Sequence, residues 1–168
     1  DSAGSVDLIK KEVTETTHKA VSIALASSKL KKKDVVLAPV KTRKDKYSTP
    51  MKKDPFKIPV EEQIEILMTA ERIIAEHSSL IKSSSAFFRA LRENKLFMST
   101  EGAEITQQIT WCGGGLEGIA IKNGEVQRRS YPASFRGNFS TSGYEFFESL
   151  TLVDNAKDVG REAVQLLD

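Results

Sequence analysis

The sequence has few of the residue types that hold metal ions or form covalent cross-links. Its 168 residues include one cysteine, Cys112, and two histidines, His18 and His77. A single cysteine excludes an internal disulfide and a paired-cysteine metal site. Neither histidine is followed, three or four residues later, by a partner that would complete a zinc site. No metal ligand is therefore predicted.

Motifs of nucleophilic catalysis are also missing. A Ser-His-Asp or Cys-His triad with His18 or His77 is formally possible, but no Gly-x-Ser-x-Gly turn supports it. His77 is expected at a helix end, where a charged imidazole interacts favourably with the helix carboxyl terminus. Cys112 is expected to be a small buried side chain in a strand. The residues thus predict no catalytic group, and a stand-alone hydrolase that uses either histidine is kept only as a competing hypothesis.

Long apolar runs are absent as well. No run approaches the roughly 18 residues that cross a bilayer, and the first residues lack the basic and apolar regions of a secretory signal. We therefore expect no membrane partner and a cytoplasmic location. Hydrophobic residues make up 39% of the chain and charged residues 29%, a balance typical of a globular protein.

The net charge of +2 hides an uneven distribution. The segment from Lys29 to Lys57 holds eleven lysines and arginines against three aspartates. Such a segment attracts phosphates, so a nucleic-acid or polyanion-binding module that uses residues 29–57 is one hypothesis for function. The segment has few aromatic residues between its charges and carries Pro50 and Pro55, which favours a solvated connecting loop.

A glycine-rich stretch contains Gly113, Gly115 and Gly118 at the Gly-x-Gly-x-x-Gly spacing of a dinucleotide-binding loop. That loop must open a helix, whose amino terminus holds the pyrophosphate. Here β-branched residues and an Asn123-Gly124 turn follow Gly118, so no nucleotide cofactor is predicted. Glycines in a strand meander mark a bulge, a bend or the close approach of another backbone. We interpret this stretch as a corner between two antiparallel strands.

Hydrophobic periodicity predicts three helices. The first covers about 7–29, with Asp7 as its cap. The second runs from Pro59, which suits a first helical position, to about Glu76. The third follows a cap at Asp154.

The other segments predict strands and loops. β-branched residues indicate a short strand at 34–40, and a long polar loop is expected at 41–58. From 84 to 131 the pattern alternates and predicts four or five antiparallel strands joined by short turns. The turns are expected at 93–95, 101–102 and 123–124. Helices on one face of an antiparallel meander give an α+β fold.

The order of several motifs resembles the TldD/PmbA family, metalloproteases also described as modulators of DNA gyrase. The motifs are an opening helix, a long loop that ends in Asp-Pro at 54–55, a Ser-x-Glu-Gly turn at 99–102, the glycine-rich stretch, and Gly143-Tyr144-Glu145. The last motif is more similar to the TldD branch than to the PmbA branch. The resemblance covers almost the whole chain.

The resemblance implies a cytoplasmic zinc protease that works as a dimer of two-domain subunits on peptides or unfolded proteins. Members of the TldD type carry a His-Glu-x-x-x-His motif and a later cysteine ligand in a carboxy-terminal domain, and no residue here matches those positions. The chain, 1–168, is therefore expected to be a single domain from the amino-terminal and central part of such a protein. Catalytic, metal and cofactor residues are not carried over, and Cys112 is not the metal cysteine.

The role implied by the resemblance is noncatalytic. The region would cover and position the active-site domain, and its partners would be its own carboxy-terminal domain, a second family subunit and a peptide substrate. An extended peptide can add to an exposed antiparallel edge through backbone hydrogen bonds, so 84–131 is a physically reasonable contact surface. The alternative partner is a nucleic acid or polyanion, bound through 29–57.

Overall fold

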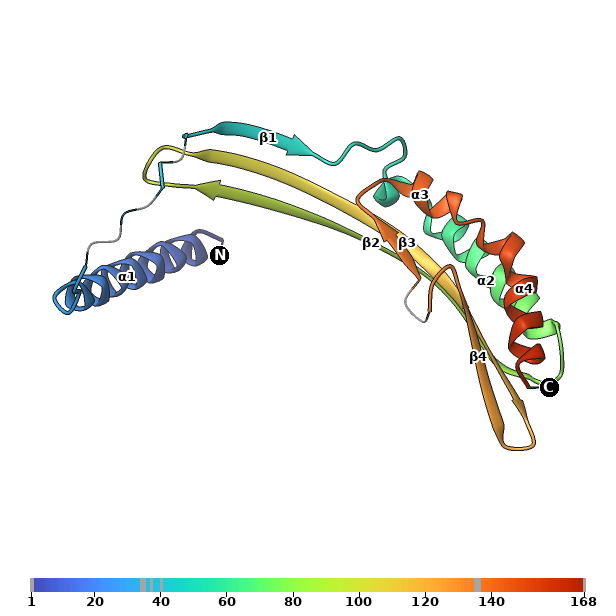
Figure 1. The fold of residues 1–168 in the computed structure, drawn as a ribbon. Helices are drawn as coiled ribbons and strands as arrows, with labels where there is room; N and C mark the ends of the chain where they lie inside the picture. The colour runs from blue at the N-terminus through green and yellow to red at the C-terminus, as the bar shows by residue number, and fades with distance from the viewer. Residues whose placement is uncertain (1, 34–35, 37, 40, 135–136, 168) are drawn as a thin grey trace. The chain divides into compact units, whose positions relative to one another are not determined.

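The computed structural model describes residues 2–33, 36, 38–39, 41–134 and 137–167. Contacts between residues divide the chain into two compact units, Asp1–Lys41 and Thr42–Asp168, and each is described by itself (Figure 1). The expectation of a single domain stays a prediction. Among the described residues, no helix has both the length and the apolar character that crossing a membrane requires.

The first unit contains one long helix, α1 (Ser2–Ser28). The helix predicted at 7–29 is confirmed, but it begins before Asp7, so the predicted cap at Asp7 is wrong. Side-chain hydroxyls of Thr14 and Thr17 donate to carbonyl oxygens four residues earlier, which satisfies these polar groups on the helix itself. The strand predicted at 34–40 falls largely on residues outside the described part of the chain.

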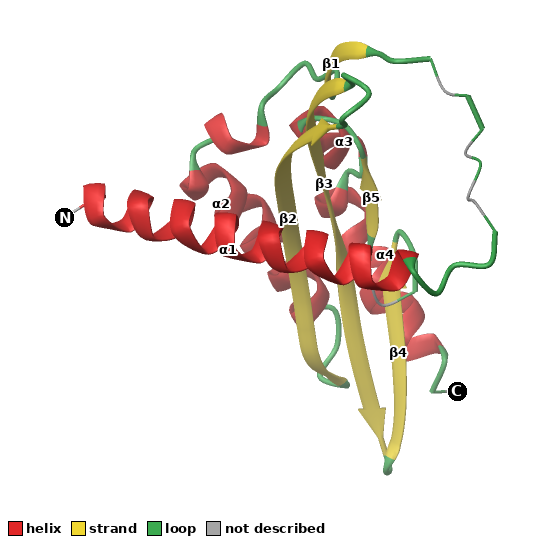
Figure 2. Ribbon diagram, turned by 90° about the vertical axis from the view of Figure 1, so that its left-hand side faces the viewer, coloured by secondary structure: helices red, strands yellow, loops and turns green. Residues whose placement is uncertain are grey.

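The second unit is a mixed sheet of five strands with helices on one face (Figures 1 and 2). The strands are β1 (Lys44–Ser48), β2 (Ile81–Met98), β3 (Glu104–Lys122), β4 (Glu125–Tyr131) and β5 (Asn138–Ser140). β3 is central, with β2 along one edge and β1, β5 and β4 along the other. The predicted α+β class is confirmed. The meander is not wholly antiparallel, because β1 pairs with β3 in parallel.

The helices of this unit are a short 3-10 helix η1 (Pro55–Lys57), α2 (Val60–Glu76), α3 (Tyr144–Ser149) and α4 (Leu152–Gln165). The helix predicted from Pro59 to about Glu76 is confirmed as α2, but Pro59 is its N-cap and Val60 its first helical residue, and His77 is its C-cap. α4 begins earlier than predicted. It follows Thr151, which has a positive φ of 45°, so Asp154 lies in the first turn and is not the cap.

Three strands occupy the region where four or five were predicted. β2 and β3 are 18 and 19 residues long, and β2 passes through 93–95 without the predicted turn. The turns at 101–102 and 123–124 are confirmed. Asn123 and Gly124 both have positive φ, 53° and 86°, as a two-residue type I′ hairpin requires. The predicted loop at 41–58 is wrong in part, since β1 and η1 lie within it.

The glycine-rich stretch lies inside β3, so the predicted corner between two strands is wrong. The glycines instead allow close approach of other chain segments. A Cβ atom on Gly113 would overlap the carbonyl oxygen of Asn138 in β5, and one on Gly114 would overlap that of Phe87 in β2. After Gly118 the chain continues as strand and hairpin, where a dinucleotide-binding loop requires a helix.

The hydrophobic core lies between the helices and only one half of the sheet. Its buried residues are Ala70, Ile74, Leu116, Tyr144, Phe147, Leu150, Leu152, Ala156 and Val159. From β2, only Ile81, Ala86 and Phe88 pack against it, and all three belong to the first half of that strand. In the second half, every residue from 91 to 98 except Arg92 is exposed. β2 and β3 therefore extend past the helices as a ribbon, along which β1 lies (Figure 1).

Candidate functional site

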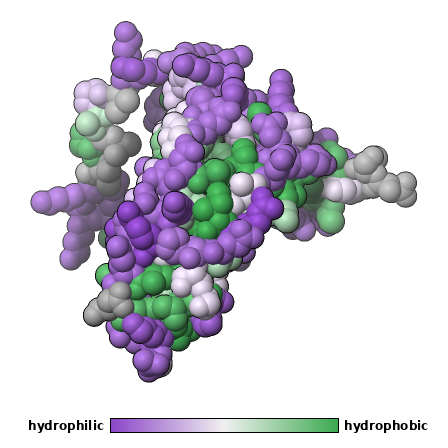
Figure 3. All heavy atoms as spheres, turned by 90° about the vertical axis from the view of Figure 1, so that its right-hand side faces the viewer, coloured by the Kyte–Doolittle hydropathy of each residue, from purple (hydrophilic) through white to green (hydrophobic). Residues whose placement is uncertain are grey.

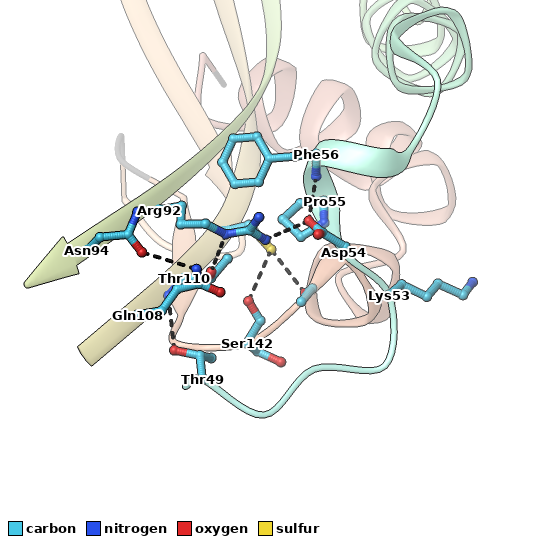
Figure 4. Close-up of polar contacts among 12 residues, drawn as sticks. Thr49, Lys53, Asp54, Pro55, Phe56, Arg92, Asn94, Gln108, Thr110 and Ser142 are labelled. Atoms are coloured by element: carbon cyan, nitrogen blue, oxygen red, sulfur yellow. Dashed lines mark hydrogen bonds and ion pairs between the residues drawn. The ribbon is translucent and has the colours of Figure 1, made fainter. Parts of the chain in front are cut away.

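Three of the motifs singled out in the sequence meet where the helix-covered half of the sheet ends. The backbone N–H of Tyr144 donates to the carbonyl oxygen of Lys53 at 2.8 Å, which joins the start of α3 to the Asp-Pro loop. The thiol of Cys112, in the glycine-rich strand, donates to the carbonyl oxygen of Gly143 at 3.0 Å (Figure 4). Segments distant in sequence are thus fastened together at one place.

Glu145 holds this junction with a carboxylate that accepts hydrogen bonds from four donors. The donors are the backbone N–H groups of Lys52, Lys53 and Gly143 and the hydroxyl of Ser142, at 2.9–3.2 Å. Burial alone would raise the pKa of Glu145, but the backbone hydrogen bonds outweigh it and lower the pKa to about 2. The carboxylate therefore stays charged and binds the 52–53 loop to α3.

A second polar group links η1 to the ribbon (Figure 4). Arg92 of β2 donates to Asp54 at 2.7 Å and to the hydroxyl of Thr110 at 3.0 Å. Its guanidinium also lies 4.8 Å from the ring centre of Phe56. Burial would raise the pKa of Asp54, but the hydrogen bonds from Arg92 and from the N–H of Phe56 lower it. Asp54 and Arg92 thus neutralise each other's charge and form a structural ion pair.

Cys112 is fully buried in β3, which confirms the prediction of a small buried side chain in a strand. Burial raises the pKa of its thiol to about 11. A neutral buried thiol is a poor nucleophile, because the thiolate is the reactive form.

We expect the thiol of Cys112 to be unreactive toward an aromatic disulfide reagent in the folded chain and to react fully in denaturant. The measurement is the amount of thiolate released with time, in buffer and in urea. Fast, complete reaction in buffer would show that the thiol is accessible and would contradict its burial in β3.

The two histidines belong to elements other than those that form this junction. His77 is at the carboxyl end of α2, as predicted, and a Cβ on Gly160 of α4 would lie 2.9 Å from its side chain. His77 thus packs between two helices. His18 belongs to α1, in the other unit. Among the described residues, no group of three or more His, Cys, Asp or Glu is placed to hold a metal ion.

Part of the basic segment at 29–57 is paired within the second unit. Lys53 lies 2.6 Å from Glu148, and Lys44 lies 3.8 Å from Glu104. These pairs reduce the charge that the segment presents to a polyanion, but exposed pairs are weak. Nucleic-acid binding through this segment stays a prediction.

The face of the sheet away from the helices carries an aromatic hollow that the sequence patterns did not indicate. Trp111 and Phe139 meet edge to face at 5.3 Å between ring centres, and Phe87 stacks on Phe139 at 6.4 Å. Arg89 lies 5.6 Å from the ring centre of Phe87. These residues, with Ser85 and Glu117, line a hollow of about 790 Å³. The rings come from three strands, so only the strand register could have brought them together.

The outer surface of α2 also exposes apolar side chains. Val60, Ile64 and Met68 follow one another at four-residue spacing and are 57%, 47% and 63% exposed. Figure 3, which views the right-hand side of Figure 1, shows hydrophobic residues in green among hydrophilic ones in purple. This ridge, the aromatic hollow and the outer edge of β2 are surfaces suited to contacts with other chains.

Comparisons with known proteins place the chain in a family. Residues 53–167 match the model of the PmbA/TldA metallopeptidase central domain. Over 130 residues the chain is 28% identical to the protein named Metalloprotease MJ0996 of Methanocaldococcus jannaschii, an alignment that covers 77% of this chain and 28% of that relative. The chain thus spans less than a third of that relative's length. Because the family model matches most of the chain, this protein belongs to the TldD/PmbA metallopeptidase family, and its second unit contains the family's central domain.

Proposed function

We propose that the Thr42–Asp168 unit is a noncatalytic domain of a zinc metallopeptidase that controls substrate access and binds partner subunits. The observation that supports this role is the use of the motif residues. Glu145, Cys112 and the glycines fasten segments of the fold together, and their polar groups are occupied in doing so. The surfaces that remain available for binding are the aromatic hollow, the outer edge of β2 and the apolar ridge on α2.

In this proposal the zinc and the catalytic residues belong to a separate carboxy-terminal domain of the parent protein. The parent is a cytoplasmic dimer that cleaves peptides or unfolded proteins, consistent with the family's description as metallopeptidases. The aromatic hollow binds apolar side chains of the substrate on their way to the zinc. Aromatic rings suit this task, because they bury large apolar areas with little loss of side-chain freedom.

The proposal predicts that the 168-residue chain alone binds no stoichiometric zinc and does not cleave casein, whereas the full-length parent does both. In the parent, Trp111→Ala should raise KM for casein about five- to thirtyfold, the effect of losing roughly 1–2 kcal/mol of binding. The zinc content and kcat should not change. The measurements are metal analysis and initial rates of cleavage.

Val126→Ala in the parent is the matched control, because Val126 is 58% exposed on β4 and lies outside the residues that line the hollow. Its kinetic constants should equal those of the wild type. Zinc-dependent cleavage by the 168-residue chain would contradict the noncatalytic role. An unchanged KM for Trp111→Ala would remove the hollow from the path of the substrate.

A further inference from the structure

The outer edge of β2 carries no strand in the described part of the chain. β2 pairs only with β3, so it ends the sheet on that side. In its first half, Ile81, Ala86 and Phe88 pack with the helices. In its second half, Arg92 contacts η1 through Asp54 and Phe56, and residues 93–98 are exposed. An exposed edge of this length is a template for another strand, and proteins seldom leave such an edge uncovered.

The direction of the backbone groups on this edge follows from hydrogen bonds of β3. The carbonyl oxygen of Gln108 accepts from Thr49, and the N–H of Thr110 donates to the same residue, so both groups point away from β2. Asn94 and Arg92 of β2 lie opposite Gln108 and Thr110. These two pairs are therefore the non-hydrogen-bonded pairs of the antiparallel ladder, and the backbone N–H and C=O groups of Asn94 and Arg92 point to the outer edge of β2. By alternation the same holds for Ala90, Leu96 and Met98.

The side chains of this segment complement a second copy of themselves. In an antiparallel pairing centred on Asn94, Glu93 lies opposite Lys95 of the other copy, and Leu91 lies opposite Phe97. Two-fold symmetry makes each pair occur twice. All four side chains are exposed, between 47% and 56%. Opposite charges and apolar pairs across strands are favourable, by about 0.2–1 kcal/mol each.

Neighbouring registers are less favourable. Centring the pairing on Arg92, Glu93 or Lys95 places two like charges opposite each other on the symmetry axis. Centring it on Leu91 extends the overlap to residue 84, into the half of β2 that packs with the helices. At the centre on Asn94, the side-chain oxygen accepts from Gln108 at 3.1 Å, which leaves the amide nitrogen to donate across the axis.

We propose that residues 90–98 of β2 pair antiparallel with the same residues of a second copy of this chain, in the register centred on Asn94. The two sheets then become one continuous sheet across the dimer. The inference rests on the proposed partner-binding role and deepens it by naming the partner and the surface. Its test measures self-association and not proteolysis, so the two proposals can fail separately.

Charge reversal at the paired positions tests the register. In Glu93→Lys, lysines face lysines across the axis, and in Lys95→Glu, glutamates face glutamates. Each variant alone should bind itself at least about tenfold more weakly than the wild type binds itself. An equimolar mixture should restore the dimer, because every charged pair between the two variants is then opposite in sign. The measurement is the mass distribution in analytical ultracentrifugation, against the 18.6 kDa of one chain.

Asp158→Lys is the matched control, because Asp158 forms a comparable exposed pair with Arg161 on α4, away from the edge. It should dimerise like the wild type, and circular dichroism should show all variants folded. Dimers of undiminished strength in either single variant, or a mixture that stays monomeric, would overturn the register. A monomeric wild type at about 100 μM would overturn self-pairing, since it places the Kd above that concentration. In that case, loss of casein binding by Glu93→Lys would show that the edge of β2 binds an extended peptide and not a second copy of the chain.

Discussion

Replacing Gly114 with valine should prevent the Thr42–Asp168 unit from folding cooperatively. A Cβ atom there would overlap the carbonyl oxygen of Phe87 and lie 2.8 Å from the ring of Phe147. β3 cannot move away from either, because β2 and β5 pair with it on opposite edges. Overpacking against side chains that can shift costs about 1–3 kcal/mol. Overlap with backbone costs more, which is a large part of a typical total stability of about 5–15 kcal/mol.

The measurement is urea unfolding followed by far-ultraviolet circular dichroism, where Gly114→Val should show no sigmoidal transition. Gly118→Ala provides the comparison within the same strand. Its Cβ would lie 2.9 Å from the Cγ2 methyl group of Ile74, a side-chain atom and not backbone, so a small shift of α2 or of this side chain can relieve the contact. We expect that variant to fold with a loss of about 1–3 kcal/mol. A wild-type transition in Gly114→Val would show that the close packing around β3 is not required.

Glu145→Gln should lower the free energy of unfolding at pH 7 by about 1–3 kcal/mol, the usual contribution of a hydrogen-bonded charged group. The wild-type carboxylate accepts from two backbone N–H groups of the 52–53 loop, and an amide retains only one acceptor oxygen. The variant should therefore loosen the contact between this loop and α3. Urea unfolding at constant pH gives the difference.

The same substitution should change how stability depends on pH. The pKa of Glu145 is about 2 in the folded chain, against an ordinary value of 4.5. Since the folded pKa is depressed, the stabilisation by this carboxylate is complete above the ordinary value and is lost as pH falls from about 4.5 through about 2. Glu145→Gln should remove part of that decline. Glu125→Gln, at an exposed hairpin position, should change stability by less than about 0.5 kcal/mol and keep the wild-type decline.

Some local patterns made reliable predictions. The apolar stripe after Pro59 predicts α2, and Asn123-Gly124 predicts the β3–β4 turn, because helix periodicity and a two-residue turn depend on neighbouring residues. The caps were less reliable, since α1 begins before Asp7 and α4 before Asp154. The burial of Cys112 was predicted from the usual behaviour of a lone cysteine. The motif order was also sufficient to indicate the family, which the match over 53–167 confirms.

Features that depend on distant contacts were not predictable from the sequence. The charged residues at 93–95 read as a turn, but β3 pairs with them and keeps β2 extended. The polar residues of β1 predict a loop, because all its side chains are exposed and none marks a buried face. Its parallel pairing with β3 joins residues about 60 positions apart and leaves no local signal. Gly113 and Gly114 read as a corner, whereas the segments that crowd them come from β2, β5 and α3.

The candidate site was the least predictable part. No residue was proposed for it, because Phe87, Trp111 and Phe139 are unremarkable strand residues until the register brings them together. The edge of β2 was not predictable either. Its charges are present in the sequence, but only the hydrogen bonds of Gln108 and Thr110 to Thr49, on the other side of β3, show which backbone groups of β2 face outward.

The unequal cover of the sheet divides the unit into parts that resist opening to different degrees. Beside α2 and α4, separating the strands would expose the whole core at once. Beyond the link that Arg92 makes to Asp54 and η1, residues 93–98 of the ribbon are exposed, so this end can fray or bend at little cost in global stability. A ribbon of this kind can adjust its curvature to a neighbouring chain while the core keeps its shape. The Thr42–Asp168 unit thus combines a rigid, helix-covered half of the sheet with a flexible strand ribbon.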